Sequence, residues 1–197
     1  MSRGIEIRAN NITDVENLLA GQLRSQQPDT IKYALVNIIY WGYAKIGYRQ
    51  NRIDAFMDNV SSFQIQAFQT LTSTNKIPTL RAIKEIGLPQ YSGMSFITKI
   101  LMFLKPNDYC VLDQQIAKLR DPASNKVLND LVFGKKDAQI RISKHNEAVY
   151  DGWCHECLEI SLKYFRGIYR VVDIERGFFN LIQQNRLLDA REIYNDA

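Results

Sequence analysis

Two features of the sequence could do chemistry together: a loop of small residues and an aspartate downstream of it. The loop reads "LPQYSGMS" from Leu88 to Ser95, and the later segment "VLD" ends at Asp113. A helix that starts directly after a loop presents unpaired backbone N–H groups and a partial positive charge, so it can bind a phosphate without a particular side chain. The donors would come from four consecutive residues, Ser92, Gly93, Met94 and Ser95. The alternative is an ordinary connection between two helices, because Pro, Ser and Gly are common in loops.

Asp113 also has two interpretations. It precedes the segment "QQIAKL", and aspartate is a favoured residue at the N-cap of a helix. A carboxylate at that position is stabilised in its charged form by the helix N-terminus, so capping and catalysis are compatible roles.

The elements that must position these residues are helical. Apolar residues recur at steps of three and four, and sustained period-two alternation is rare, so the sequence predicts an all-α fold. With 197 residues, 46% of them apolar, the chain suits one domain over 1–197 or two packed helical halves. We expect helices at about 29–48 (capped by Asp29), 52–71, 78–86 (ended by Gly87), 94–105, 114–119, 147–164, 169–184 and 187–194. The hairpin and its flanking helices thus occupy 77–120, and the polar, basic segment 134–146 is expected to be an exposed loop or ribbon.

Composition narrows the class of protein. The net charge of +4 and pI near 8.9 are compatible with a nucleic-acid partner but are shared by many metabolic enzymes. The longest apolar runs fall short of the ~20 residues that span a bilayer, and the N-terminus lacks the apolar core of a signal peptide. We therefore expect a cytoplasmic protein with no membrane contact.

The three cysteines invite a metal interpretation. "Trp153-Cys154-His155-Glu156-Cys157" holds a Cys-x-x-Cys pair, which is half of a ligand set for zinc or iron–sulfur. Helical spacing, however, places both cysteines on one stripe with Val149, Tyr150, Trp153, Ile160 and Tyr164, and Cys110 is the single cysteine elsewhere. The sequence therefore predicts reduced thiols packed in a core, and no metal site.

The segment "EIGLPQYSGMSFITKILMFLKPNDYCVLDQQI" resembles the helix-hairpin-helix motif of the base-excision DNA glycosylases. Against the 8-oxoguanine glycosylase branch, Leu88 to Asp113 aligns without a gap. The family's Gly-Val-Gly hairpin falls on Gln90, Tyr91 and Ser92, and its essential aspartate falls on Asp113. More loosely, "YDGWCHEC" and "RVVDIERGFFNLIQQ" look like the C-terminal helices of bacterial proteins with this glycosylase-like fold.

The resemblance implies a DNA glycosylase that binds duplex DNA, flips a damaged or modified base out of the helix and hydrolyses its N-glycosidic bond. Asp113 would stabilise the oxocarbenium-like sugar and position or deprotonate the attacking water. The residues implied in DNA binding are Gln90, Tyr91, Ser92, Gly93, Met94, Ser95 and Lys99. No cofactor and no obligatory protein partner are implied, a structural monovalent cation at the hairpin is allowed, and in a bacterium the protein would associate with the nucleoid.

The chain departs from the family at the hairpin and at the nucleophile. Because Gln90 and Ser92 replace the hairpin glycines, we expect the turn to use other backbone angles or to move onto Gly93. Met94 stands where bifunctional members carry a lysine, and a thioether forms no Schiff base. Lys99 lies about 140° further around the helix, where we expect it to face solvent or a phosphate. The sequence therefore predicts base excision without lyase activity.

Two other classes of function stay open: a non-catalytic helix-hairpin-helix DNA-binding module in which Asp113 is only a cap, and a helical protein-interaction domain. Two groups of side chains bear on the choice. The aromatic group could stack on an extruded base or pack in the core, where Trp41 is expected, and it comprises Tyr40, Trp41, Tyr43 and Tyr48. The basic group could bind DNA phosphates or lie in a solvated loop, and it comprises Lys118, Arg120, Lys135, Lys136, Arg141 and Lys144.

Overall fold

The computed structural model describes residues 10–43, 49–74, 76–134 and 139–197. Within these ranges the chain forms nine α-helices, two short 3-10 helices and no strand, which confirms the all-α prediction. The helices are α1 Ile12–Leu23, α2 Pro28–Gly42, α3 Arg49–Asn59, α4 Ser62–Thr72, α5 Leu80–Glu85, α6 Met94–Leu104, η1 Ile116–Leu119, η2 Val127–Asp130, α7 Lys144–Phe165, α8 Val171–Gln183 and α9 Leu187–Asp196. No helix in the described ranges is both long enough and apolar enough to cross a membrane.

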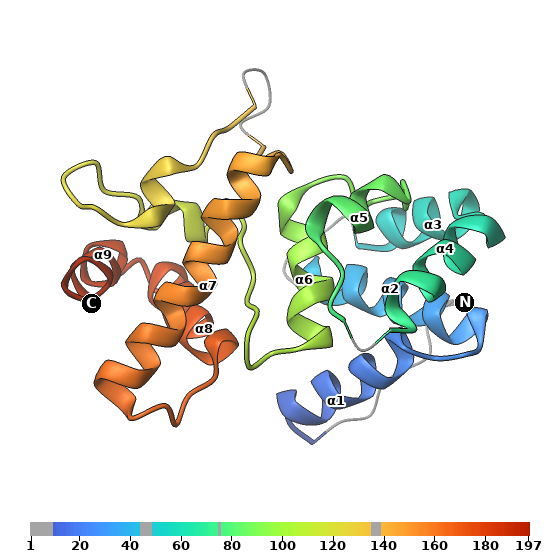
Figure 1. The fold of residues 1–197 in the computed structure, drawn as a ribbon, viewed down its shortest axis with the longest axis horizontal. Coiled ribbons are helices and arrows are strands. Elements are labelled where there is room, and N and C mark those ends of the chain that lie inside the picture. Colours follow the sequence, from blue (N-terminus) through green and yellow to red (C-terminus); the bar gives the residue numbers. More distant parts are fainter. Residues whose placement is uncertain (1–9, 44–48, 75, 135–138) are drawn as a thin grey trace.

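The helices are arranged in two groups, which Figure 1 shows side by side. Helices α1 to α6 form one half, and α7 to α9 with η1 and η2 form the other. The segment that leaves α6 runs between the two groups before it reaches η1. This connecting segment carries Asp113, so the candidate catalytic residue lies where the halves meet.

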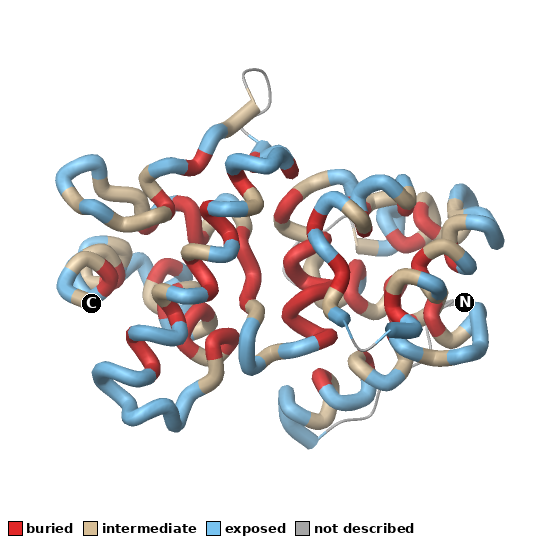
Figure 2. The backbone as a smooth tube through the Cα atoms, viewed as in Figure 1, coloured by how far each residue is buried: buried red, intermediate tan, exposed pale blue. Residues whose placement is uncertain are grey.

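Helix α6 is the centre of the N-terminal half. Most of its residues are apolar, and those that are buried include Met94, Ile97, Ile100 and Phe103. It packs against α1, α2 and α5 on one side and faces the connecting segment on the other, and the buried backbone in Figure 2 follows it along its length. A helix that is apolar all round belongs in the interior of a protein.

Several predicted boundaries were wrong. Helix α7 starts at Lys144 instead of 147, inside the segment 134–146 that was expected to be a loop or ribbon. Helix α2 starts at Pro28 with Gln27 as its N-cap, because proline suits the first helical position, and Asp29 lies in the first turn instead of capping it. The predicted helix over 52–71 is two helices. The helix is interrupted at Ser61. The Ser61 side chain accepts the Gln64 N–H, and the Gln64 side chain accepts the Ser61 N–H. This capping box starts a new helix. Helix α2 ends at Gly42 with Tyr43 as its C-cap, so the predicted end near Tyr48 was also wrong.

The C-terminal half is built around α7. Ser143 caps this helix by accepting the Asn146 N–H, and Arg166 at φ 55° ends it. Trp153, Cys154 and Cys157 are buried in the core, as predicted, with Cys110 Sγ 3.8 Å from Cys154 Sγ. Tyr164 is the exception to the predicted stripe, because it is exposed near the end of the helix.

A buried ion-pair network joins the two halves. Glu16 on α1 is 1% exposed and pairs at 2.6 Å with each of two arginines, Arg170 at the N-cap of α8 and Arg176 within α8. Asp173 also binds Arg170, at 2.8 Å. Because a buried carboxylate needs compensating partners, this network fixes α8 against α1 across the boundary.

Candidate active site at the hairpin

The predicted hairpin lies between α5 and α6. Thr79 caps α5 by accepting the Ala82 N–H, so the predicted start with Pro78 in the first turn was wrong, whereas Gly87 at φ 70° follows the end of the helix as the sequence predicts. A turn follows in which the Tyr91 N–H donates to the Leu88 carbonyl at 3.1 Å. Helix α6 then starts at Met94, also as predicted.

The turn is formed at Gln90 and not at Gly93. Gln90 has φ 69°, the left-handed conformation that glycine adopts most easily, whereas Gly93 is extended at φ −114° and ψ 165°. Proline before a residue with positive φ is the arrangement of a type II turn. The chain therefore keeps the backbone conformation of a glycine at a position that holds glutamine, and the turn does not move onto Gly93.

Tyr91 fixes the hairpin to the N-terminal half. Its ring is 1% exposed and makes edge contacts with Phe56 and Phe96, and its hydroxyl donates to the Leu35 carbonyl of α2 at 2.6 Å. Burial raises the pKa of Tyr91 well above its usual value, so the phenol remains a neutral donor. Its side chain positions the hairpin and does not face the cavity.

The start of α6 keeps most, but not all, of its predicted donors. The Met94 N–H is not free, since it donates to the Ile140 carbonyl at 3.3 Å, and the Met94 side chain is buried. The backbone N–H groups of Ser92, Gly93 and Ser95 donate to no oxygen within the described chain. Ser92 is exposed, and a Cβ added at Gly93 would meet no atom within 4 Å. An anion can therefore approach these donors from solvent.

The segment before Asp113 is held from both halves of the protein. Tyr150 and Trp153 of α7 donate to the carbonyls of Cys110 and Val111, at 2.9 and 3.2 Å. On the other side, the Leu112 N–H donates to the buried Thr98 hydroxyl of α6 at 3.2 Å. Hydrogen bonds to three consecutive residues define the path of the backbone up to Asp113.

Asp113 has one oxygen engaged and one available. Oδ1 accepts the N–H groups of Gln115 and Ile116 at 2.8 and 3.1 Å, and the Ala117 N–H donates to the Asp113 carbonyl at 2.9 Å. These bonds cap the turn that leads into the short helix, but that helix is a 3-10 helix whose N-cap is Gln115, so the predicted N-cap position at Asp113 was wrong. Oδ2 accepts no hydrogen bond from the described residues, so capping leaves one oxygen for chemistry.

One cavity of about 530 Å³ brings the predicted site residues together. It is lined by Gln90, Ser92, Gly93, Met94, Ser95, Lys99 and Asp113, which are all the predicted site residues except Tyr91. The same cavity contains Tyr43 and Arg52, two residues from earlier in the chain. Arg52 is exposed, donates to the Gln90 side chain at 3.1 Å and stacks 5.7 Å from the Tyr43 ring centre, so it adds a positive charge beside the hairpin.

Lys99 was expected to face solvent or a phosphate; the solvent alternative was wrong, and the phosphate contact stays a prediction. Lys99 is 5% exposed, and its Nζ donates to the carbonyl and the hydroxyl of Ser95, both at 3.0 Å. Burial lowers the pKa of Lys99, and the negative charge of Asp113, with that of Glu175 when Glu175 is ionised, raises it in part. The amine fits beside Gly42, where an added Cβ would lie 3.3 Å from Lys99 Cε and 2.7 Å from the Phe96 ring. Lys99 therefore belongs to the interior of the site.

A second cavity of about 430 Å³ adjoins the first at Lys99 and Asp113. Its walls are Trp41 and Phe179, and its polar residues include Glu175 of α8. Sequence reasoning missed Arg52 and Glu175, because both come from helices far from the hairpin in sequence and neither belongs to a motif. Trp41 was expected in the core, and it does pack on Phe103 with ring centres 5.4 Å apart while lining this cavity.

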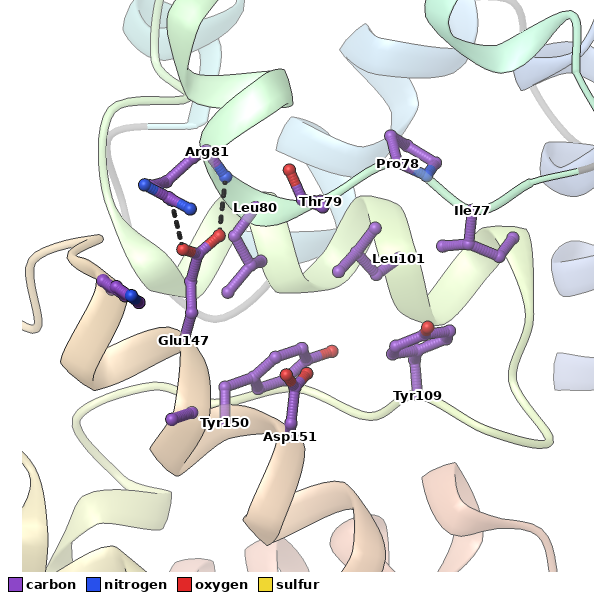
Figure 3. Close-up of a pocket in the computed structure, with 12 residues that line it drawn as sticks. Ile77, Pro78, Thr79, Leu80, Arg81, Leu101, Tyr109, Glu147, Tyr150 and Asp151 are labelled. Atoms are coloured by element: carbon purple, nitrogen blue, oxygen red, sulfur yellow. Dashed lines mark hydrogen bonds and ion pairs between the residues drawn. The ribbon is translucent and has the colours of Figure 1, made fainter.

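A third cavity, of about 370 Å³, lies between α5, α6 and α7 and contains none of the predicted site residues. Figure 3 shows Arg81 above Glu147, whose carboxylate accepts the Arg81 backbone N–H at 3.0 Å and pairs with its guanidinium at 2.5 Å. Tyr109 and Tyr150 line the same cavity with nearly parallel rings. Burial, and then Glu147, raises the pKa of Asp151 there.

Of the basic residues that could bind phosphates or be solvated, those that the structure describes, Lys118, Arg120, Arg141 and Lys144, do not line the hairpin cavity. Lys135 and Lys136 lie outside the described residues, and Arg120 stacks on Phe133 at 5.0 Å and donates to the Asn129 carbonyl. Among the described residues, no group of three or more His, Cys, Asp and Glu side chains could hold a metal ion. The monovalent cation at the hairpin stays a prediction.

Comparison of the chain with protein-family models, with curated proteins and with solved structures found no match.

Proposed function

We propose that this protein is a DNA glycosylase that binds duplex DNA and hydrolyses the N-glycosidic bond of a damaged or modified base. The observation that carries the proposal is the cavity in which the hairpin, the N-terminus of α6 and Asp113 meet. A helix N-terminus can bind a phosphate of a nucleotide, and a carboxylate beside it can stabilise positive charge that develops on the sugar.

Each part of the site has a role in this proposal. The N–H groups of Ser92, Gly93 and Ser95, with the exposed Arg52 guanidinium beside them, bind phosphates of the DNA backbone. The free Oδ2 of Asp113 stabilises the positive charge that develops on the sugar and takes a proton from the attacking water. The adjoining cavity between Trp41 and Phe179 receives the flipped base.

The proposal is tested by release of a free base. Purified protein is incubated with duplexes that carry oxidised, deaminated and alkylated bases, and with phage or bacterial DNA that carries natural base modifications. Mass spectrometry detects free base, and alkali reveals abasic sites. We expect release by the wild-type protein, loss of release in Asp113→Asn, and DNA binding by both. DNA binding without release of any base would instead indicate a non-catalytic DNA-binding module, and release unaffected by Asp113→Asn would refute the mechanism.

Excision is proposed to leave the DNA strand intact. Met94 is buried and forms no Schiff base, and the Lys99 amine donates to two oxygens of its own helix. Borohydride added during turnover should therefore trap no covalent protein–DNA adduct. An adduct that is formed by the wild-type protein and lost in Lys99→Met would assign lyase chemistry to Lys99.

The phosphate contact has a separate test. Gly93→Trp should fold normally, because an added Cβ meets open space, but the bulky ring should block DNA from the donors and weaken affinity. Gly21→Trp is the matched control, since Gly21 is equally open but lies on α1. Equal DNA affinity of the two variants would contradict a phosphate site at the hairpin.

A further inference from the structure

The second cavity contains a buried acid that the proposed mechanism does not yet use. Glu175 is 4% exposed on α8, and it lines this cavity with the aromatic side chains of Trp41 and Phe179. Asp113 and Lys99 line the same cavity, at its junction with the hairpin cavity. Two carboxyl groups therefore face one space, and Glu175 is on the side assigned to the base.

The surroundings of Glu175 favour its protonated form. Burial raises the pKa of Glu175 to about 8, and the negative charge of Asp113 contributes to the increase. The positive charges of Lys99 and Arg176 and the nearby backbone N–H of Val111 act in the opposite direction and are outweighed. Because the pKa lies above neutral, the group carries a proton at pH 7 and loses it as the pH rises through about 8.

The remaining titratable groups near Glu175 do not change this balance. Cys110 and Cys157 are fully buried, and burial raises the pKa of Cys157 to about 11 and that of Cys110 well above its usual value. Both thiols are therefore neutral at pH 7. The Arg176 guanidinium is directed to Glu16, with which it pairs at 2.6 Å.

We propose that Glu175 is the general acid that protonates the departing base, opposite Asp113 on the sugar side. The inference deepens the proposed glycosylase function and rests on it. Two carboxyl groups in one site that differ in protonation at the same pH are the usual arrangement for acid and base roles. Trp41 and Phe179 provide apolar surfaces on which a planar base can stack while its polar edge reaches the Glu175 carboxyl.

The bond between the sugar C1′ and the base nitrogen breaks, and its electron pair goes to the base. The Glu175 proton moves to a nitrogen or oxygen of the base, so the base leaves neutral. Water forms the new bond to C1′ and gives its proton to Asp113. One proton returned from Asp113 to Glu175 restores the starting state.

A comparison of neutral and cationic leaving bases tests this role. The neutral probe is a duplex with the neutral base that the wild-type protein releases fastest. The cationic probe is a duplex with 7-methylguanine. This base already carries a positive charge in the duplex, so it needs no proton to leave. Single-turnover release is measured for the wild-type protein, Glu175→Gln and the matched control Glu159→Gln, which changes an exposed glutamate of α7 outside the cavity.

We expect Glu175→Gln to slow release of the neutral base by about 10²- to 10⁴-fold, the usual contribution of a general acid, and to change release of 7-methylguanine little. Wild-type release of the neutral base should also fall as the pH rises through about 8. Equal slowing of both bases would indicate a structural role and overturn the proposal while the glycosylase function stands. No release of any base by the wild-type protein overturns both.

A second measurement needs no DNA. Infrared difference spectroscopy of the protein detects the C=O stretch of a protonated carboxylic acid. At pH 7 we expect this band in the wild-type protein and in Glu159→Gln but not in Glu175→Gln. In the wild-type protein the band should disappear as the pH rises through about 8. A wild-type spectrum at pH 7 without a band assignable to Glu175 overturns the proposal, even if Glu175→Gln fails to fold.

Discussion

The Thr98 hydroxyl connects α6 to the segment that positions Asp113, so its removal should affect both stability and function. Thr98 is fully buried, and its Oγ1 accepts the Leu112 N–H at 3.2 Å while it donates to the Met94 carbonyl at 2.9 Å. Thr98→Val keeps the shape of the side chain and leaves the Leu112 N–H buried without a partner. An unpaired buried donor costs about 1 to 3 kcal/mol.

Urea unfolding and thermal unfolding measure this cost. For a chain of this size, a loss of about 1 to 3 kcal/mol corresponds to a decrease of roughly 2 to 12 °C in Tm. Thr98→Ser is the matched control, because it keeps the hydroxyl and loses one methyl group, for about 0.8 kcal/mol. A Thr98→Val variant as stable as the wild-type protein, or a Thr98→Ser variant destabilised as much as Thr98→Val, would refute the reasoning.

Three further predictions concern the hairpin and the contact between the halves. Gln90→Gly should raise the free energy of unfolding, measured in urea titrations, by up to about 1 kcal/mol. Relief of the left-handed glutamine gains about 1 to 2 kcal/mol, and the greater entropy of glycine in the unfolded chain offsets part of this gain. A decrease in the free energy of unfolding would contradict strain at this turn. Glu16→Ala should cost about 3 to 5 kcal/mol, since it leaves Arg170 and Arg176 without their buried partner, and a loss near zero would show that the network does not hold α8 to α1. The hydrogen bond from Arg170 lowers the pKa of Asp173, so its contribution to stability is complete above the unfolded pKa near 3.9 and is lost as the pH falls below it. Asp173→Asn should flatten the acid limb of the stability curve, and an unchanged limb would exclude this origin.

Local signals in the sequence were sufficient for most of the helices and for the hairpin. Gly87 ends α5 and Met94 starts α6 as predicted, because helix ends follow from residues within a few positions of them. The capping bonds of Asp113 follow from the same local chemistry. The break at Ser61 was predictable too, since Ser61 and Gln64 have the spacing of a capping box.

The environment of the site depended on packing that sequence periodicity does not specify. Lys99 was assigned to solvent or a phosphate from its angle around α6. The connecting segment and α8 cover that side of the helix, so the side chain is enclosed. Arg52 and Glu175 reach the site from α3 and α8, and no spacing rule relates either of them to Asp113. Gln90 keeps a positive φ because the buried Tyr91 beside it fixes the turn from the other side.

The central claim is that Asp113 stabilises positive charge on a nucleotide sugar, and one binding measurement tests it without knowledge of the base. Two duplexes are compared, one with a pyrrolidine abasic analogue that carries a positive charge at the sugar and one with the neutral tetrahydrofuran analogue. At a protein surface, opposite charges about 4 Å apart attract by up to about 4 kcal/mol, so a preference of at least tenfold is expected. The wild-type protein should bind the cationic duplex at least tenfold more tightly, and Asp113→Asn should bind both duplexes equally. Equal affinity of the wild-type protein for the two duplexes, or the same preference in Asp113→Asn, would contradict the account.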